Sequence, residues 1–459
     1  MHEPSEIYRS IDLALRVGEV VMSSGAGAAD VSATMLAVTS ACGLRGCVID
    51  VNFTTLAVAY QASPDVAPET HMRVVRYRGQ EYGQLTQVET LVRDLGAGRI
   101  DRTGAGRRLN EVLSAPRPYP RWSVTASTGA LAGGVALLLG GDWLVLLVAI
   151  VAAITIDLSN RALARRRVPV FYAQVLGAFI ATSITLGLFA LDLPIRPSPV
   201  IAASIIVLLA GASLVGSVQD ALTGYYVTAA ARMFEVILLT AGIIAGIALA
   251  LSISTRFGMQ LSVSPTSTTW SQVPFALLGG TIAAVAFAFG CQAPARALLP
   301  IGLTALVGEV VFLASDQAEI GVAAASAAAA TAVGLVSYTL AGRVRVPALI
   351  VVVSAVVPLL PGLTIYRGLF QLSQDDIRGA FSLLTAFSIG IALAAGVYLG
   401  EYVAQPLQRE ARRLETRLAG PRLVGPLVPV ARRTVRRRAA RRHRIRRHLP
   451  PHPRSSPLE

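Results

Sequence analysis

Long, mostly apolar segments recur along the chain between residues 122 and 402. Each holds about 17–24 residues, the length that an α-helix needs to cross a bilayer. Ten such segments are found: 123–140, 142–158, 170–191, 198–219, 228–251, 273–292, 298–315, 319–341, 346–366 and 380–402. The pattern therefore predicts an α-helical polytopic membrane protein with ten transmembrane helices.

Residues 1–121 show a different pattern, in which the apolar positions suit a small folded domain. Helical spacing predicts a helix near the N-terminus, and Asp30 is placed to cap a second one. β-Branched and aromatic residues then alternate over 47–60 and again over 71–78, which indicates three strands. Helical spacing returns before the proline-rich segment 116–120. We therefore expect an N-terminal α+β domain.

The ten predicted spans divide into two sets of five. Residues 214–251 and 359–400 share an order of features: a glycine-containing end of one span, a polar loop with Asp, and a span ending in Ala and Gly. Because five is odd, the second set would enter the membrane from the opposite side, as in the inverted repeats of many secondary transporters. The alternative is that apolar helices rich in Ala and Gly simply look alike. The expected modules are 122–252 and 253–402.

Composition supports a membrane location and confines the net charge to one segment. Apolar residues make up 53% of the 459 residues and charged residues 15%, too few charges to cover a soluble monomer. The formal net charge is +14, yet residues 407–459 alone hold 16 Arg and 3 acidic residues. We expect residues 403–459 to form an Arg-rich, mostly disordered cytoplasmic tail that binds anionic lipids. We expect no nucleic acid partner.

The Arg residues between the predicted spans indicate the orientation. They concentrate before the first span and in the loops after the second, sixth and eighth, whereas the other loops are poor in Arg. Loops rich in basic residues face the cytoplasm. Both termini are therefore predicted to be cytoplasmic, which agrees with an even number of spans.

Polar residues within apolar spans are costly and mark candidate binding sites. Six are assigned to substrate binding: Asp157, Asn160, Gln219, Asp220, Arg232 and Glu235. Arg232 and Glu235 stand at i and i+3 of one helix and offer a cation for a carboxylate and an anion for an ammonium group. A structural ion pair is the alternative for these two residues. Solvated helix ends are the alternative for Asp157 and Asp220.

Glu309 lies well inside the seventh span, with no basic neighbour close in sequence. We predict that its carboxyl group takes up and releases the coupling proton, with Glu235 as a second candidate. A carboxylate paired to a residue from a distant segment is the alternative for Glu309.

Two further groups of residues are predicted to control access. Arg367, Asp375 and Asp376 border the loop between the ninth and tenth spans and are candidates for an outer gate. A second group is expected to break or loosen helices and so to expose backbone groups to substrate or ions: Gly211 and Gly216 in the fourth span, and Pro358, Pro361 and Gly362 in the ninth. Simple kinks are the alternative.

No cofactor and no metal ion are expected. The three cysteines, Cys42, Cys47 and Cys291, have no neighbouring ligands in sequence and are interpreted as small apolar side chains. The five His residues lie outside the predicted spans, and no phosphate-binding GxxxxGK[ST] motif is present.

Several segments resemble the threonine/serine exporter family. They are ALRVGEVVMSSGAGAADVSATMLAVTSACGL, VIDVNFTTLAVAY, the PRWS entry into the first span, QDALTGYYVTAAARMFEVILL and PGLTIYRGL. The resemblance covers about residues 10–402 and leaves out the Arg-rich tail.

The resemblance implies a cytoplasmic domain joined to two five-span modules in a bacterial inner membrane. It also implies that the chain is a secondary active exporter of threonine and serine, which works by proton-coupled antiport and alternating access, and is not an enzyme. Split members of the family are linked to dicarboxylates such as succinate, so dicarboxylate export is one alternative. A membrane enzyme with a catalytic N-terminal domain is another. The sequence does not decide between a monomer and a homo-oligomer.

Overall fold

The computed structural model describes residues 4–75, 79–191, 197–209, 211–256, 272–373 and 376–418. Within these ranges, seven helices are long and apolar enough to cross a membrane, and the number is nine if each of two bent helix pairs is one span. The expected polytopic helical membrane protein is confirmed at this level. The first predicted span is helical as well, but it is not among these nine.

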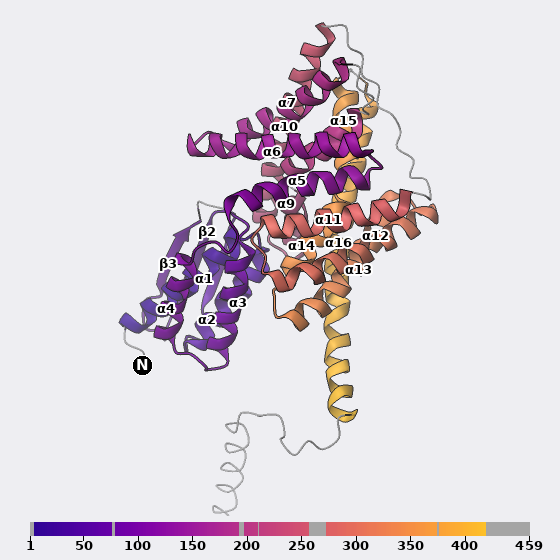
Figure 1. The fold of residues 1–459 in the computed structure, drawn as a ribbon. Helices are drawn as coiled ribbons and strands as arrows, with labels where there is room; N and C mark the ends of the chain where they lie inside the picture. The colour runs from indigo at the N-terminus through magenta and orange to yellow at the C-terminus, as the bar shows by residue number, and fades with distance from the viewer. Residues whose placement is uncertain are drawn as a thin grey trace, which may run out of the picture. The chain divides into compact units, whose positions relative to one another are not determined.

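The N-terminal part combines four helices with one sheet. Its elements are α1 (Pro4–Ser23), α2 (Ala28–Ala41), β1 (Val48–Val51), β2 (Thr55–Tyr60), β3 (Glu69–Val74), α3 (Tyr82–Gly96) and α4 (Arg102–Ser114). The strands pair antiparallel in the order β1-β2-β3. Leu56 and Val58 point to the same face of β2, because side chains alternate along a strand, and both are fully buried. The helices lie beside this sheet (Figure 1).

The remaining helices form two sets with the same order and spacing. The unbroken helices of the first set are α5 (Arg121–Leu138), α6 (Trp143–Arg165), α7 (Val170–Ala190) and α10 (Tyr226–Arg256). Those of the second set are α11 (Val273–Gly290), α12 (Ala295–Gln317), α13 (Val322–Val344) and α16 (Arg378–Leu418). Each helix of the second set begins 152 residues after its counterpart, at 273, 295, 322 and 378 against 121, 143, 170 and 226.

The fourth member of each set is a broken helix. In the first set, α8 (Pro197–Ile205) and the 3-10 turn η1 (Ile206–Leu208) are followed by α9 (Gly211–Leu222), with a bend of 59°. In the second set, α14 (Ala348–Val356) and η3 (Val357–Leu359) are followed by α15 (Gly362–Ser373), with a bend of 46°.

The structure breaks the ninth span at the predicted residues. Pro358 lies in η3, and Pro361 and Gly362 stand at the start of α15. In the fourth span, Gly211 begins α9 directly after the interruption, whereas the prediction for Gly216 is wrong. Gly216 lies within α9, and the interruption comes earlier, between Leu208 and Gly211. Gly216 has a different reason to be glycine: a Cβ there would lie 2.5 Å from Nη1 of Arg232.

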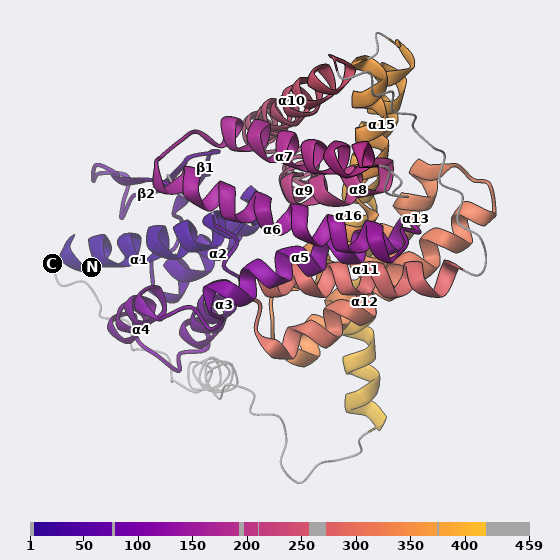
Figure 2. The same cartoon turned by 45° about the horizontal axis from the view of Figure 1, so that its top comes forward.

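The two sets of helices meet at a backbone contact between α5 and α11, which lie side by side (Figure 2). A Cβ added to Gly134 would lie 2.6 Å from the carbonyl oxygen of Gly279 and 2.8 Å from the backbone nitrogen of Ala283. Glycines also bring α7 against α10, at Gly246, and α13 against α16, at Gly334. Close backbone approach matters in lipid, because apolar side chains gain little by leaving an equally apolar solvent.

Substitution Gly134→Ala is expected to destabilise the membrane part by about 1–3 kcal/mol, because no rotamer change can remove a Cβ that overlaps a backbone oxygen. The measurement is the thermal unfolding midpoint of the detergent-purified protein. Gly187→Ala on α7 is the matched control, since a Cβ there meets nothing within 4 Å. Equal midpoints for the two variants would show that the α5–α11 contact is not needed for stability.

Candidate functional site

A buried ion pair joins the end of α9 to the start of α10. The Nε of Arg232 lies 3.2 Å from Oδ2 of Asp220, and the two side chains are 6% and 0% exposed. The turn between the helices brings them together, with Gly224 in the left-handed region at φ +91° and the Tyr225 N–H donating to the Asp220 carbonyl. A buried pair of charges persists only where its other polar atoms also find partners.

Those partners come from the N-terminal part. The backbone N–H of Ala28 donates to Oδ1 of Asp220 over 2.7 Å, and Nη2 of Arg232 donates to the carbonyl oxygen of Ala26 over 2.7 Å. The ion pair therefore holds the segment that begins α2. We call Asp220, Arg232 and residues 26–28 the interdomain clamp.

The clamp also corrects the predicted cap of α2. Asp30 lies inside the first turn of the helix, and Gly27 is the N-cap, without a side chain to accept from the first N–H groups. The carboxylate of Asp220 takes that role from a different part of the chain. Its negative charge also suits the positive end of the helix dipole.

Gln219 and Glu235 lie beside the clamp. A Cβ on Gly27 would lie 3.6 Å from the side-chain amide carbon of Gln219, so this residue packs against the same turn. Glu235 and Arg232 line one cavity of about 330 Å³. Four of the six predicted substrate residues are thus brought together, but the ion-pair partner that the structure gives to Arg232 is Asp220.

Asp157 and Asn160 belong to another part of the structure. Asp157 pairs with Arg161 one turn later on α6, with 2.8 Å between Oδ2 and Nη2. The Oδ1 atom of Asn160 is buried, and among the described residues it has no hydrogen-bond partner.

Glu309 lies within α12 and is 3% exposed. Among the described residues, neither of its carboxylate oxygens has a hydrogen-bond partner. The carboxylate packs against Gly280 of α11, where any side chain would collide with it. Glu309 also lines a cavity of about 230 Å³ whose wall includes residues 358–364, the break between η3 and α15.

The two helix breaks contact each other. A Cβ on Gly362 would lie 3.2 Å from the Ile206 side chain and 3.4 Å from that of Leu209. Gln174 of α7 donates from Nε2 to the Leu208 carbonyl over 3.1 Å. This bond satisfies a carbonyl that the interrupted helix leaves without its usual partner.

The outer-gate candidates are only partly described. Arg367 is half-buried within α15. Asp376 accepts from the backbone N–H of Arg378 over 3.0 Å, at the start of α16. Asp375 lies outside the described residues. Because α15 begins 151 residues after α9, Gln371 is the counterpart of Asp220 in the second set. Gln371 links α15 to α16 by accepting from Ser382 over 2.9 Å.

Sequence reasoning missed several polar groups that the fold brings into these sites. Gln174 could have been noticed as an amide within an apolar span, whereas the role of the Ala26 and Ala28 backbone had no sequence signal.

Asp30, Glu89 and Glu401 line one further cavity, of about 330 Å³, with Gln219. Desolvation, and after it the nearby Asp220 carboxylate, raises the pKa of Asp30.

Comparison with known proteins identifies the family. Two models of the threonine/serine exporter family match residues 12–254 and 276–403. The chain belongs to the threonine/serine exporter family. It is 37% identical to a Mycobacterium tuberculosis protein named "Probable threonine/serine exporter". The match spans 422 residues, which are 90% of this chain and 80% of that relative.

Two further relatives bear on the substrate. A Corynebacterium glutamicum protein named "Threonine/serine exporter" is 36% identical over 416 residues, which are 89% of this chain and 85% of the relative. An Escherichia coli protein named "Probable succinate transporter subunit YjjP" is 27% identical over 244 residues, 52% of this chain and 93% of the relative. No solved structure matches the chain.

Substitution Asp220→Ala is expected to release the start of α2 from the membrane helices of this family member. It leaves Arg232 buried without its counter-charge, a change that costs about 3–5 kcal/mol in buried pairs, and it removes the acceptor of the Ala28 N–H. The measurement is hydrogen exchange over residues 24–30 in the full-length protein, where exchange should become faster.

Asp65→Ala, in the exposed turn between β2 and β3, is the control and should leave exchange in this segment unchanged. Unaltered protection of residues 24–30 in Asp220→Ala would contradict the role assigned to the clamp.

Proposed function

We propose that this chain is a secondary active exporter that moves threonine and serine out of the bacterial cytoplasm by antiport with protons. Membership of the exporter family, and two relatives named as threonine/serine exporters that match over at least 80% of their length, support this substrate class. The observation that carries the proposal is the contact between two helix breaks beside the buried Glu309. Such an arrangement suits a transporter and not an enzyme.

The proposed architecture has ten spans in two inverted units of five, with a cytoplasmic N-terminal domain. The constant offset of 152 residues between α5, α6, α7 and α10 and their counterparts supports a repeat. The nine candidate spans become ten when α5 is included. An odd number per unit inverts the second unit. The Arg-rich loops favour cytoplasmic termini in a bacterial inner membrane.

The substrate is proposed to bind between the two breaks. A zwitterionic amino acid needs donors for its carboxylate and acceptors for its ammonium group. Interrupted helices offer both, because their N-terminal ends present free N–H groups and their C-terminal ends present carbonyls. The starts of α9 and α15, at Gly211 and Gly362, supply such N-terminal ends.

Glu309 is proposed to carry the coupling proton. Glu309 and the second helix break line the same cavity. The charge on Glu309 can therefore affect substrate binding at that break, and bound substrate can affect the protonation of Glu309. Charged groups inside a membrane are costly and are typical of proton pathways. Alternating access of this cavity to the two sides would let the carboxyl group gain a proton outside and lose it inside.

The N-terminal domain is proposed to control the cytoplasmic mouth through the interdomain clamp. The clamp ties α2 to the end of α9, which is the second half of a broken span. A movement of α9 during transport would therefore move the domain or break its contacts. This mechanical link favours gating over a separate catalytic role for residues 1–121. The Arg-rich tail is proposed to lie on anionic lipids, although its residues from 419 onward are outside the described ranges.

Dicarboxylate export is the second candidate, and one observation favours it: the Escherichia coli relative named "Probable succinate transporter subunit YjjP" matches 52% of this chain. Counterflow in proteoliposomes loaded with threonine, serine or succinate separates the two candidates. We expect labelled threonine and serine to exchange and labelled succinate to remain outside. Exchange of succinate alone would replace the proposal with dicarboxylate export, and exchange of none would refute both.

Substitution Glu309→Gln is expected to abolish accumulation driven by a pH gradient, because an amide cannot carry the proton. Counterflow of threonine, which needs no net proton movement, should persist. Both are measured as radiolabel uptake into inside-out vesicles. Glu319→Gln, an exposed carboxylate just after α12, is the control and should retain both activities. Full gradient-driven accumulation in Glu309→Gln would rule out this residue as the proton carrier.

A further inference from the structure

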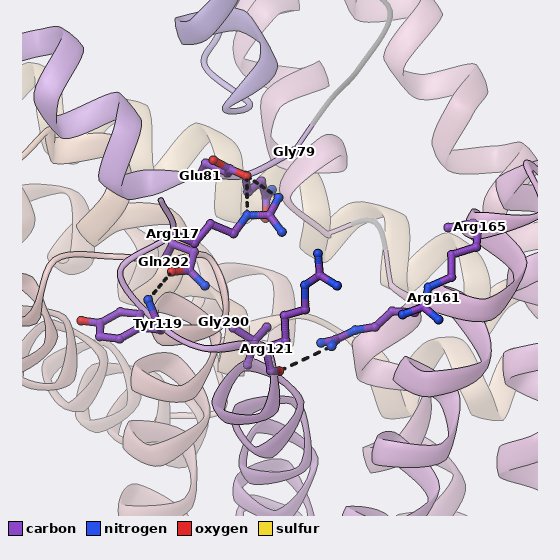
Figure 3. Close-up of a pocket in the computed structure, with 12 residues that line it drawn as sticks. Gly79, Glu81, Arg117, Tyr119, Arg121, Arg161, Arg165, Gly290 and Gln292 are labelled. Carbon is purple, nitrogen blue, oxygen red and sulfur yellow. Dashed lines mark hydrogen bonds and ion pairs between the residues drawn. The ribbon is translucent and has the colours of Figure 1, made fainter. Parts of the chain in front are cut away.

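A cavity of about 500 Å³ lies where the N-terminal part meets the ends of three membrane helices. Four arginines line it: Arg117 and Arg121 from the segment that leads into α5, and Arg161 and Arg165 from the last turns of α6 (Figure 3). We propose that this four-arginine cavity binds a phosphate group, and that the source of the phosphate is the headgroup of an anionic phospholipid.

The charges in the cavity are only half compensated. Arg117 donates from Nη2 and Nε to one oxygen of Glu81, over 2.6 and 3.1 Å. Arg161 is paired with Asp157. Among the described residues, Arg121 and Arg165 have no acidic partner within ion-pair distance. Two positive charges in one concave site repel each other and concentrate a positive potential, which an anion relieves.

The side chains of Arg117 and Arg161 are held in place by contacts within the protein. Glu81 holds Arg117, and Arg161 donates to the Arg121 carbonyl over 3.4 Å in addition to its ion pair. Figure 3 shows Arg121 standing between Arg117 and the two arginines of α6. Guanidinium groups present paired N–H donors that match phosphate oxygens in a bidentate geometry, so a preformed cluster of them favours phosphate over a neutral zwitterion.

The connecting segment itself is anchored to the end of α11. The Tyr119 N–H donates to Oε1 of Gln292 over 3.0 Å, and the Tyr119 ring stacks on Phe289 with centroids 4.1 Å apart. These contacts fix the position of Arg117 and Arg121 relative to α6. A ligand in the cavity would thus touch the N-terminal part and both halves of the membrane part at once.

The position of the cavity suits a lipid. Trp122 follows Arg121 directly and is 74% exposed. Exposed tryptophans at helix ends lie at the membrane–water interface, at the depth of the lipid headgroups. The cavity volume of about 500 Å³ is within the range of small-molecule sites. An anionic headgroup can therefore reach the arginines without leaving the bilayer.

The test is lipid binding by the full-length protein in mild detergent, followed by native mass spectrometry with phosphatidylglycerol and phosphatidylcholine. In the double variant Arg121→Gln/Arg165→Gln we expect the affinity for phosphatidylglycerol to fall roughly 25-fold, about fivefold for each arginine near the headgroup. The matched control is Arg166→Gln/Arg343→Gln, which removes the same charge from exposed helix ends outside the cavity. It should change the affinity less than about twofold.

Equal losses in the two double variants would overturn the proposal, because they would show attraction to net charge without a site. An unchanged affinity in Arg121→Gln/Arg165→Gln would do the same, provided that its thermal unfolding midpoint matches that of the unsubstituted protein. Inorganic phosphate supplies a separate arm. Stabilisation by phosphate without retention of phosphatidylglycerol would overturn the lipid as the source, and retention of phosphatidylglycerol that excess phosphate weakens would support it.

Discussion

The ion pair between Asp220 and Arg232 is the interaction on which the arrangement of this protein depends. Each charge would be too costly to bury alone, and neither is fully satisfied by the other. Each side chain also makes one hydrogen bond to the backbone of residues 26–28, which belongs to a separate part of the chain. Helices α9 and α10 and the start of α2 therefore form one unit, and each needs the others to be in place.

The broken helices face the same requirement to pair buried polar groups. An interruption in a membrane helix leaves carbonyl and N–H groups without partners, which is tolerated only inside the protein or beside a cavity. Here one interruption is partly filled by the Gln174 amide, and the other opens to the cavity that holds Glu309. The two halves of the chain meet this shared constraint differently, which gives each break its own chemistry.

The sequence predicted those features that depend on local pattern. Apolar run length located the helices, alternation located the strands, and Pro361 with Gly362 marked a break, because proline cannot continue the hydrogen-bond ladder and glycine favours other conformations. The prediction that Gly216 breaks a helix was wrong, because a glycine that makes room for Arg232 looks the same in the sequence as a glycine that interrupts a helix. The contacts of Asp220 and Arg232 with residues 26–28 could not be read locally, since they join segments about 200 residues apart.

The contact of α5 with α11 has a consequence for how the halves of this fold can be shared between genes. Where the two helices touch at Gly134 and Gly279, their close approach depends on the absence of a side chain at these two positions. Two separate polypeptides could form such a seam as readily as one, provided that both keep the small residues. The Escherichia coli relative is named as a subunit, and its match covers 52% of this chain. A side chain at either glycine would separate the two helices, whether the two halves belong to one polypeptide or to two.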